Sequence, residues 1–435
     1  MEQHKLEQKK QIFFKNLLKD LVSPAYGCTE IGCVALACSA AAEHLKGPVV
    51  SAKLHVSSYI YRNDANVGVP KLGQVGIKTI AAAGFIVKQS KKKLLVLSSI
   101  TDAQAKLAKQ NSKQNFIDII IEKHRNPVYA KVIAKDKFNN TCEVLIERKH
   151  DNIKRITLNN KLVAVNTKTK ASNVHTYKYN VDDISLNDVY YGVQNFTIND
   201  VKFLRDGLMM NKKVMNYGEK HREGFTKVAM AGYSFNETNW KNQLLTSIVS
   251  SITARMVSCP LPVMASNDSG DHGLTVNLPQ WIYHTCCKTS ELTMLKATAL
   301  ANLITWKIKK NIGSLSAYCG SVVAAVSGTI CGLGYQRNYS IKQINDVLNL
   351  CLCSSAGSLC DGAKLSCAWK IEAAIVAGFA AMDVVESKIA LPDNEGLVNR
   401  DAFETIKSIG ILSRGIMNDT NSIVVDIIDK NERAK

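Results

Sequence analysis

Residues 315–334 have the sequence LSAYCGSVVAAVSGTICGLG, a run without a single charged side chain that decides how the second half of the chain folds. The run is about as long as a membrane span. Its many Ser, Gly and Cys residues, however, let neighbouring helix backbones approach closely. The whole chain is 46% hydrophobic and 21% charged, which is typical of globular proteins. We therefore expect a helix buried in a protein core and no membrane span.

Similar segments, helical in pattern and rich in small residues, fill the chain from about residue 184 to its end. Clusters of Gly and Pro mark turns between periodic segments. Such corners occur at SCPLP (258–262), SNDSGDHG (266–273), GLGYQRN (332–338) and SAGSLCDGAK (355–364). These patterns predict an α-helical domain over residues 181–435.

The first 47 residues are also helical in pattern. Apolar residues recur at helical spacing over residues 7–21, and Ser23, Pro24 and Gly27 then interrupt the pattern before a second, apolar helix. We expect residues 1–47 to form N-terminal helices that carry the motif GCTE (27–30) and pack on the helical domain.

Between residues 49 and 165 the apolar residues instead alternate with period two, in short runs that predict strands. Helices are expected near residues 76–87 and 102–110, and Asn139-Asn140 and Asn159-Asn160 have the chemistry of hairpin turns. We predict an inserted α/β module at residues 48–180 with a mainly antiparallel sheet. The overall class is then α+β: a mostly α-helical domain with this insertion.

The chain is basic, with a formal net charge of +18, which raises the question of nucleic-acid binding. Only 11 of the 55 basic residues are Arg, whereas phosphate and base recognition favours Arg. No zinc finger or aromatic RNA-binding motif accompanies the lysines. We interpret the charge as a solvated basic surface, with no nucleic-acid partner. The charged start MEQHKLEQKK lacks the apolar core of a secretory signal, and we expect a cytoplasmic protein.

Thirteen cysteines in such a chain cannot form a disulfide framework, because the cytosol keeps thiols reduced. No CxxC pair occurs, which disfavours zinc ribbons and thioredoxin-like chemistry. Nine cysteines fit buried small hydrophobic positions. The remaining four lie in or shortly after glycine-containing corners: Cys28, Cys319, Cys360 and Cys367.

Cys360 and Cys367 are seven residues apart, which is two helical turns, and the Asp361-Gly362 step can bend the chain to bring them together. Cys319 would supply a third thiolate from a different helix. Three thiolates among small apolar residues suit a 4Fe-4S cluster that leaves one iron open as a Lewis acid. From the spacing alone, three unrelated buried cysteines remain the alternative.

Cys28 is predicted to lie at a helix N-terminus, where the helix dipole and free N–H groups lower the pKa of a thiol. The corner at residues 269–273 can offer backbone N–H groups to a substrate carboxylate when it opens a helix or a strand. Lys364 or Arg255 could add a counter-charge there, or could be structural.

A set of motifs, taken in order along nearly the whole chain, resembles the iron-sulfur L-cysteine desulfidase family, which is related to the α chain of iron-sulfur L-serine dehydratases. The matching segments are GCTE (27–30), YRN (61–63), GVP (68–70), ARM (254–256), LP (261–262), LSAYC (315–319), CDGAK (360–364) with Cys367 and Lys370, and NEG (394–396).

The resemblance implies a PLP-free β-elimination that converts L-cysteine to pyruvate, ammonia and sulfide, with L-serine as a related substrate. It implies that Cys319, Cys360 and Cys367 bind a 4Fe-4S cluster and that Cys28 acts on the Cα proton. The expected partner is a small amino-acid substrate, and a homodimer is left open. Residues expected to contact the substrate are Asn63, Arg255, Ser269, Gly270, Asp271, His272 and Lys364.

The chain departs from the family pattern at the substrate corner, where the family typically has GSGNQG and this chain has DSGDHG (268–273). Two acids near an anionic substrate would repel it unless they are protonated or paired. Two further departures are Ile31, where proline usually follows GCTE, and Lys71, where glycine usually follows GVP. His272 could be a proton shuttle or could simply fill the space of glutamine. The alternative function is therefore a catalytically silent iron-sulfur-binding or sensing homologue.

Overall fold

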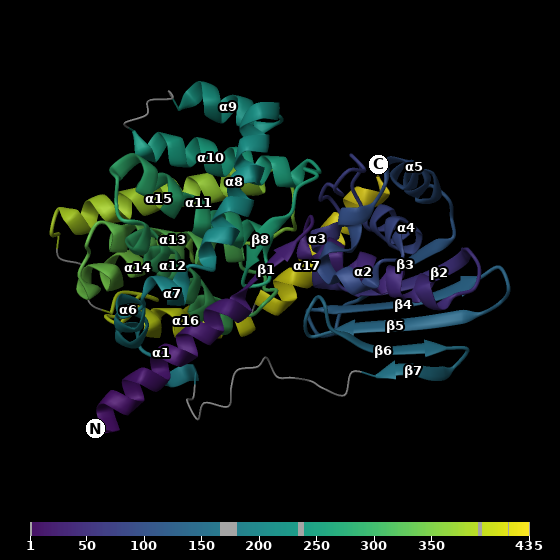
Figure 1. Ribbon diagram of the computed structural model, residues 1–435, viewed down its shortest axis with the longest axis horizontal. Coiled ribbons are helices and arrows are strands. Elements are labelled where there is room, and N and C mark those ends of the chain that lie inside the picture. Colours follow the sequence, from purple (N-terminus) through teal and green to yellow (C-terminus); the bar gives the residue numbers. More distant parts are fainter. Residues whose placement is uncertain (1, 166–180, 234–238, 390–393, 416, 435) are drawn as a thin grey trace.

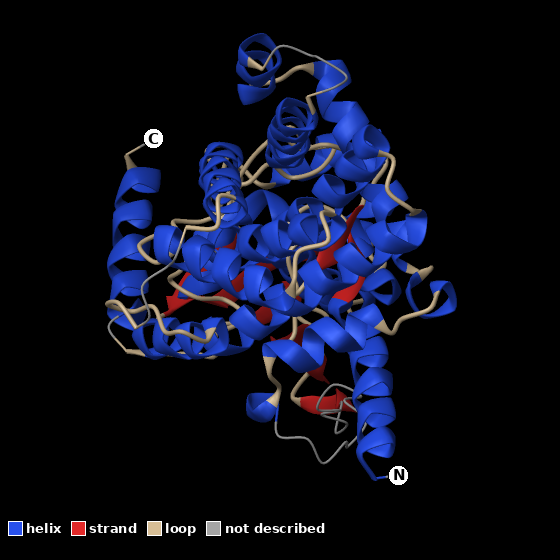
Figure 2. Ribbon diagram, turned by 90° about the vertical axis from the view of Figure 1, so that its left-hand side faces the viewer, coloured by secondary structure: helices blue, strands red, loops and turns tan. Residues whose placement is uncertain are grey.

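The computed structural model describes residues 2–165, 181–233, 239–389, 394–415 and 417–434 (Figure 1). Helices dominate it, and the strands are few among them (Figure 2). The predicted α+β class is confirmed. Up to residue 165 the elements are α1 (Glu2–Leu21), β1 (Val22–Ala25), α2 (Thr29–His44), β2 (Val49–Ser57), α3 (Ser58–Asp64), α4 (Ile77–Val87), η1 (Ser90–Ser99), α5 (Asp102–Asn111), β3 (Ile117–Glu122), β4 (Tyr129–Asp136), β5 (Thr141–Glu147), β6 (Ile153–Leu158) and β7 (Lys161–Val165).

The second part of the chain is almost entirely helical. Its elements are η2 (Val181–Asp183), α6 (Leu186–Gln194), α7 (Ile198–Val201), α8 (Leu204–His221), α9 (Phe225–Gly232), α10 (Trp240–Met256), β8 (Val263–Ser266), α11 (Gly270–Cys287), α12 (Glu291–Ile312), η3 (Ser321–Val326), α13 (Ser327–Gln336), α14 (Ile341–Ser355), α15 (Cys367–Glu386), α16 (Ala402–Arg414) and α17 (Met417–Arg433).

Six strands form one mixed sheet in the order β3-β2-β4-β5-β6-β7, in which only the β2–β3 pair is parallel. The mainly antiparallel sheet was therefore correctly predicted. Asn159 and Asn160 both have positive φ in the two-residue turn between β6 and β7, as such hairpins require. Helices α2 and α4 pack on the sheet, and Figure 1 shows them on the same side of it.

The helical part is built around α12, which is buried along most of its length and contacts α11, α13 and α16. The helix expected over residues 315–334 begins later than predicted. Residues 315–319 of this run are not helical, because Tyr318 forms a β-bridge with Leu359. A π-helical segment, η3, then leads into α13. Among the described residues no helix combines the length and apolarity that crossing a bilayer requires.

A small second sheet joins the segment that precedes the GCTE motif to the segment that leads into the corner at residues 266–273. β1 pairs antiparallel with β8, so that Val22 lies opposite Ser266 and Ala25 opposite Val263. This pairing was not predicted from the sequence, because the prolines and glycines near both segments are also typical of simple breaks between helices. The pairing matters because it places the GCTE motif next to the corner at residues 266–273.

The N-terminal helices divide their contacts between the two parts of the molecule. α1 contacts α6 and α12, whereas α2 contacts α4 and the strands β4 and β5. The C-terminal helix α17 returns to contact α3, and the C-terminus lies near α5 in Figure 1. The domain boundaries 1–47, 48–180 and 181–435 remain predictions, and the end of the module at 180 falls outside the described residues.

Candidate functional site

A cavity of about 80 Å³ lies where α2, α3 and the ends of α10, α11 and α12 meet the loops before η3 and α15. Many of the residues predicted to form the site line it, together with several that were not predicted. The lining residues are Cys28, Glu30, Arg62, Asn63, Arg255, Asp268, Ser269, Asp271, His272, Lys309, Ser314, Leu315, Ser316, Tyr318, Cys319, Gly320, Ser321, Cys360, Gly362, Ala363 and Cys367.

Three cysteines on this cavity, Cys319, Cys360 and Cys367, form what we call the thiol triad. Backbone hydrogen bonds hold the first two side by side: the Cys319 N–H donates to Ser358 O at 2.9 Å, and the Cys360 N–H donates to Ala317 O at 2.7 Å. Cys367 is the first residue of α15. The chain bends between Cys360 and Cys367, as predicted.

The bend depends on Gly362, whose φ of +97° is one that residues with a side chain rarely adopt. A Cβ at this position would also collide with the carbonyl oxygen of Arg62. Glycine here therefore lets the loop that carries Cys360 pack directly on the backbone of α3. A second close approach occurs at Gly320, where a Cβ would lie 2.8 Å from Nε2 of His272.

The thiol triad has the donor chemistry that an iron-sulfur cluster requires, since soft thiolates are its usual ligands. Among the described residues no three His, Cys, Asp or Glu side chains converge tightly enough to hold a single metal ion. A cubane cluster instead binds each thiolate to a different iron, so its ligands surround a cavity. Burial raises the pKa of Cys319 to about 11 and also raises that of Cys367, so metal binding is what would favour their thiolates.

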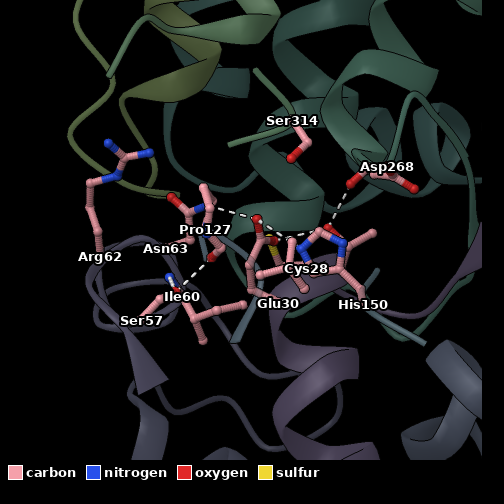
Figure 3. Close-up of polar contacts among 12 residues, drawn as sticks. Cys28, Glu30, Ser57, Ile60, Arg62, Asn63, Pro127, His150, Asp268 and Ser314 are labelled. Atoms are coloured by element: carbon pink, nitrogen blue, oxygen red, sulfur yellow. Dashed lines mark hydrogen bonds and ion pairs between the residues drawn. The ribbon is translucent and has the colours of Figure 1, made fainter. Parts of the chain in front are cut away.

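On another side of the cavity lies a second group, the Glu30 network, which consists of Cys28, Thr29, Glu30, Asn63 and His150 (Figure 3). The Cys28 thiol donates to Glu30 Oε2 at 2.6 Å, and the Thr29 hydroxyl donates to the same oxygen at 2.9 Å. The Asn63 amide donates to Glu30 Oε1 at 2.7 Å. His150 Nε2 lies 3.9 Å from that oxygen. Glu30 is thus the centre of the network.

Cys28 stands at the N-terminus of α2, as predicted, but the expectation of a lowered thiol pKa is wrong. The thiol makes no capping hydrogen bond to α2. Burial and the charge of Glu30 raise its pKa well above the usual value, because both disfavour a thiolate. Burial also acts to raise the pKa of Glu30, but His150 and the hydrogen bonds outweigh it, so that this pKa is lowered. The resting pair is a thiol beside a carboxylate.

The substrate corner is a tight turn between β8 and α11. Asn267 and Asp268 both have positive φ, and Ser266 and Ser269 exchange backbone hydrogen bonds at 3.0 Å. The Thr29 hydroxyl oxygen also lies 2.8 Å from Asp268 O, so its one hydrogen is shared between Glu30 and this carbonyl. The contact joins this turn to the GCTE motif. α11 then begins at Gly270, so the corner opens a helix, one of the two kinds of element expected to follow it.

One of the two unusual acids of the corner, Asp271, is compensated by a buried cation. Arg255 Nη1 lies 2.6 Å from Asp271 Oδ1, and both side chains are buried. The charge of Asp271 therefore does not oppose an anionic substrate. Burial lowers the pKa of His272 to about 3, with a further contribution from Lys309, so His272 is neutral and cannot serve as the compensating cation. Lys71 donates to the backbone oxygen of Ile100 and does not line the cavity.

Two further cations line the cavity without a carboxylate partner among the described residues. Lys309 Nζ donates to Ser314 O at 2.6 Å, and burial lowers its pKa to about 8. Arg62 is only 1% exposed, and it donates to Asn421 Oδ1 at 2.7 Å and to Ser316 O at 3.0 Å. Neither residue was predicted.

Two predicted substrate contacts are not at the cavity surface. Lys364 is partly exposed and forms an ion pair with Asp361, which explains its position without a substrate. Gly270 packs against the Arg255 side chain, where a Cβ would lie 2.5 Å from Nε. Glu30 and Arg62 were missed although the motifs GCTE and YRN contain them. His150 and Lys309 have no local sequence feature that marks them.

Comparisons with known proteins identify the family of the chain. Residues 91–426 match the family model described as serine dehydratase alpha chain. The chain is 30% identical over 433 residues to a UPF0597 protein of Clostridium perfringens strain SM101, covering 98% of this chain and 100% of the relative.

A UPF0597 protein of Clostridioides difficile strain 630 is 32% identical over 422 residues, which cover 95% of this chain and 98% of that protein. Another UPF0597 protein, from Finegoldia magna, is 30% identical over 416 residues, which cover 95% of this chain and 98% of that protein. These names state no activity, whereas the matched family model covers most of the chain. The protein therefore belongs to the serine dehydratase alpha chain family.

Proposed function

We propose that the protein is an iron-sulfur-dependent, PLP-free lyase that converts L-cysteine to pyruvate, ammonia and sulfide by β-elimination, with L-serine as a related substrate. One observation carries the proposal: a single buried cavity is lined both by three thiols and by the Cys28–Glu30 pair. β-Elimination needs both functions, a group that accepts the Cα proton and a group that receives the leaving atom.

The thiol triad would hold a 4Fe-4S cluster, which supplies an open iron as a Lewis acid for the leaving sulfur or oxygen when it is bound. The protein itself would supply the remaining functions. Cys28 lies at the start of α2 and faces Glu30, so it can take part in removing the Cα proton. Gly320 and Gly362 let the segments that carry Cys319 and Cys360 pack closely against His272 and the backbone of Arg62.

The substrate carboxylate would be bound by the cavity cations that lack a carboxylate partner, Lys309 and Arg62. Arg255 is less suited, because Asp271 already neutralises it. Ser269 and the first turn of α11 can add hydroxyl and backbone N–H donors, as helix N-termini do for anions. These donors suit the carboxylate of an α-amino acid.

The test is anaerobic purification and reconstitution, followed by analysis of iron and acid-labile sulfide. The reconstituted protein is then given L-cysteine, L-serine and a panel of other thiol and hydroxy amino acids, and sulfide, pyruvate and ammonia are measured. We expect about four irons per chain, as a 4Fe-4S cluster requires, and release of equal amounts of sulfide and pyruvate from L-cysteine.

The alternative function, a silent iron-sulfur-binding or sensing protein, gives a different result in the same experiment. It predicts bound iron with no turnover of any amino acid in the panel. Turnover of L-serine without turnover of L-cysteine would keep the lyase but change its substrate. A protein that binds no iron under these conditions would contradict both functions.

A further inference from the structure

The Glu30 network has a property that binding the substrate does not require. A buried carboxylate accepts the hydrogen of a buried thiol at 2.6 Å, while its other oxygen accepts an amide hydrogen from Asn63 at 2.7 Å. Glu30 is 4% exposed and Cys28 is 6% exposed. Such a charge-assisted hydrogen bond fixes the direction of the thiol hydrogen. The Cys28 sulfur lies beside the Arg255 guanidinium. It can accept a proton through a lone pair while Glu30 accepts the proton that it already holds.

We propose that Glu30 is the proton acceptor of the elimination and that Cys28 is the relay through which the Cα proton reaches it; this inference rests on the proposed lyase function. The Cα–H bond breaks and its proton bonds to Cys28 Sγ, while the former thiol proton moves to Glu30 Oε2. The electron pair of the Cα–H bond forms the Cα–Cβ double bond, and the Cβ–S bond breaks with its pair on sulfur. The sulfur leaves as hydrosulfide, and the proton from Glu30 converts it to hydrogen sulfide.

The surroundings of Glu30 are suited to this task. Its two oxygens receive three hydrogen bonds, from Cys28, Thr29 and Asn63, which orient the carboxylate toward the thiol. His150 reaches it from the turn between β5 and β6, and the Nε2 atom of this histidine is buried without a hydrogen-bond partner. The inserted module thus contributes a residue to the site. In Figure 3, Cys28, Asn63 and His150 surround Glu30, whereas Arg62 turns away from it.

Glu30 also interacts electrostatically with titratable groups on several of the elements around the cavity. Burial, and then the charge of Glu30, raise the pKa of Asp64 well above its usual value, which favours its uncharged form. Within the described part of the chain neither oxygen of that carboxyl has a hydrogen-bond partner. The titratable or charged groups that interact electrostatically with Glu30 are Cys28, Cys33, Asp64, His150, Arg255, Asp271, His272 and Lys309.

The decisive variant is Glu30→Gln, which keeps the size of the side chain but removes its basicity. If Glu30 accepts the proton, kcat falls by about 100-fold or more, the usual range for a general base, while KM changes little. With L-cysteine deuterated at Cα, the isotope effect on kcat rises because proton removal becomes the slow step. Iron content is unchanged. Glu43→Gln on the same helix, whose carboxylate accepts from Ser90 at its far end, is the matched control and keeps full turnover.

A second measurement needs neither the cluster nor turnover. In cluster-free protein, the rate at which iodoacetamide alkylates Cys28 is followed by peptide mass spectrometry. Removing the neighbouring carboxylate favours the thiolate, so Cys28 should be alkylated several-fold faster in Glu30→Gln. The buried Cys38 on the same helix and the exposed Cys287 should react at unchanged rates, which excludes a general loosening of the fold.

In Glu30→Gln, kcat falls while the rate of Cys28 alkylation rises only if Glu30 is the acceptor. If Cys28 alone were the base, a variant with more thiolate would keep or gain turnover, and that result overturns the relay. Loss of iron in Glu30→Gln, or faster alkylation of Cys38, shows a structural role and also overturns it. If the wild-type protein turns over no amino acid, the proposed function itself fails.

Discussion

The thiol triad and part of the Glu30 network, namely Cys28, Glu30 and Asn63, line one cavity, but the triad and the network are held in place by different means. Cys319 and Cys360 are positioned by backbone hydrogen bonds to Ser358 and Ala317, and Cys367 by the start of α15. The Glu30 network is held by side chains from α2, α3 and the inserted module. We infer that the triad can lose a thiol without losing its shape, whereas a change in the network alters its neighbours.

The largest expected effect is on the triad. Replacing Cys319, Cys360 or Cys367 by Ser should remove most of the bound iron and with it the turnover, because a hydroxyl is a poor substitute for a thiolate. Since the backbone holds this corner, the cluster-free variants should melt at the wild-type temperature. Iron analysis and thermal unfolding test both statements, with the exposed Cys287→Ser as control. Full iron retention in all three single variants would refute the ligand assignment.

The second effect concerns Arg255, which connects the two sides of the cavity. It pairs with Asp271 at 2.6 Å and also lies 3.5 Å from the backbone oxygen of Gly27. Arg255→Met leaves the carboxylate of Asp271 buried and unpaired, which typically costs about 3–5 kcal/mol of the free energy of unfolding. The double variant Arg255→Met with Asp271→Leu should recover most of this loss. Urea unfolding of the cluster-free proteins measures it, and a single variant as stable as wild type would contradict the pairing.

The third effect is catalytic. Cys28→Ser should keep its iron and its fold but lose turnover by about 100-fold or more, equivalent to roughly 2.7 kcal/mol of transition-state stabilisation. A serine hydroxyl can still donate to Glu30, but it is far harder to deprotonate than a thiol. Iron analysis and a sulfide-release assay separate this residue from the triad. Loss of iron would make Cys28 a fourth ligand instead.

The triad is held by the local backbone and the Glu30 network by side chains from distant segments, and this difference explains how much the sequence could predict. The helical and strand patterns located most elements, and the Asn159-Asn160 turn and the bend at Gly362 follow from local backbone chemistry. The cysteines of the thiol triad could be singled out because they lie in or shortly after glycine-containing corners, and their role as cluster ligands stays a prediction. Each of these features depends on neighbours in the sequence.

The Glu30 network could not be found in that way. His150 is separated from Glu30 by 120 positions in the numbering, and the two meet only because α2 packs on the module that contains β5 and β6. The raised pKa of the Cys28 thiol has the same origin, since it depends on burial and on the carboxylate of Glu30 rather than on the helix N-terminus. The compensation of Asp271 by Arg255 likewise became visible only in three dimensions.

The smallest expected effect tests whether the module takes part in the chemistry. Charge on His150 helps to lower the pKa of Glu30 against the effect of burial, so His150→Gln should raise that pKa. If Glu30 must be ionised to accept a proton, turnover is lost as the pH falls through its pKa, and the acidic limb of the kcat profile should move to higher pH in the variant. The plateau above this limb should change little.

The matched control is His55→Gln, which removes a histidine of the same module whose partner is Glu122 at 2.8 Å, outside the cavity. Its acidic limb should coincide with that of the wild-type protein. An acidic limb that stays in place in His150→Gln, or that moves to lower pH, would mean that His150 does not influence Glu30. A shift to higher pH confined to His150→Gln would instead show that a residue of the inserted module sets the protonation of a carboxylate in the helical site.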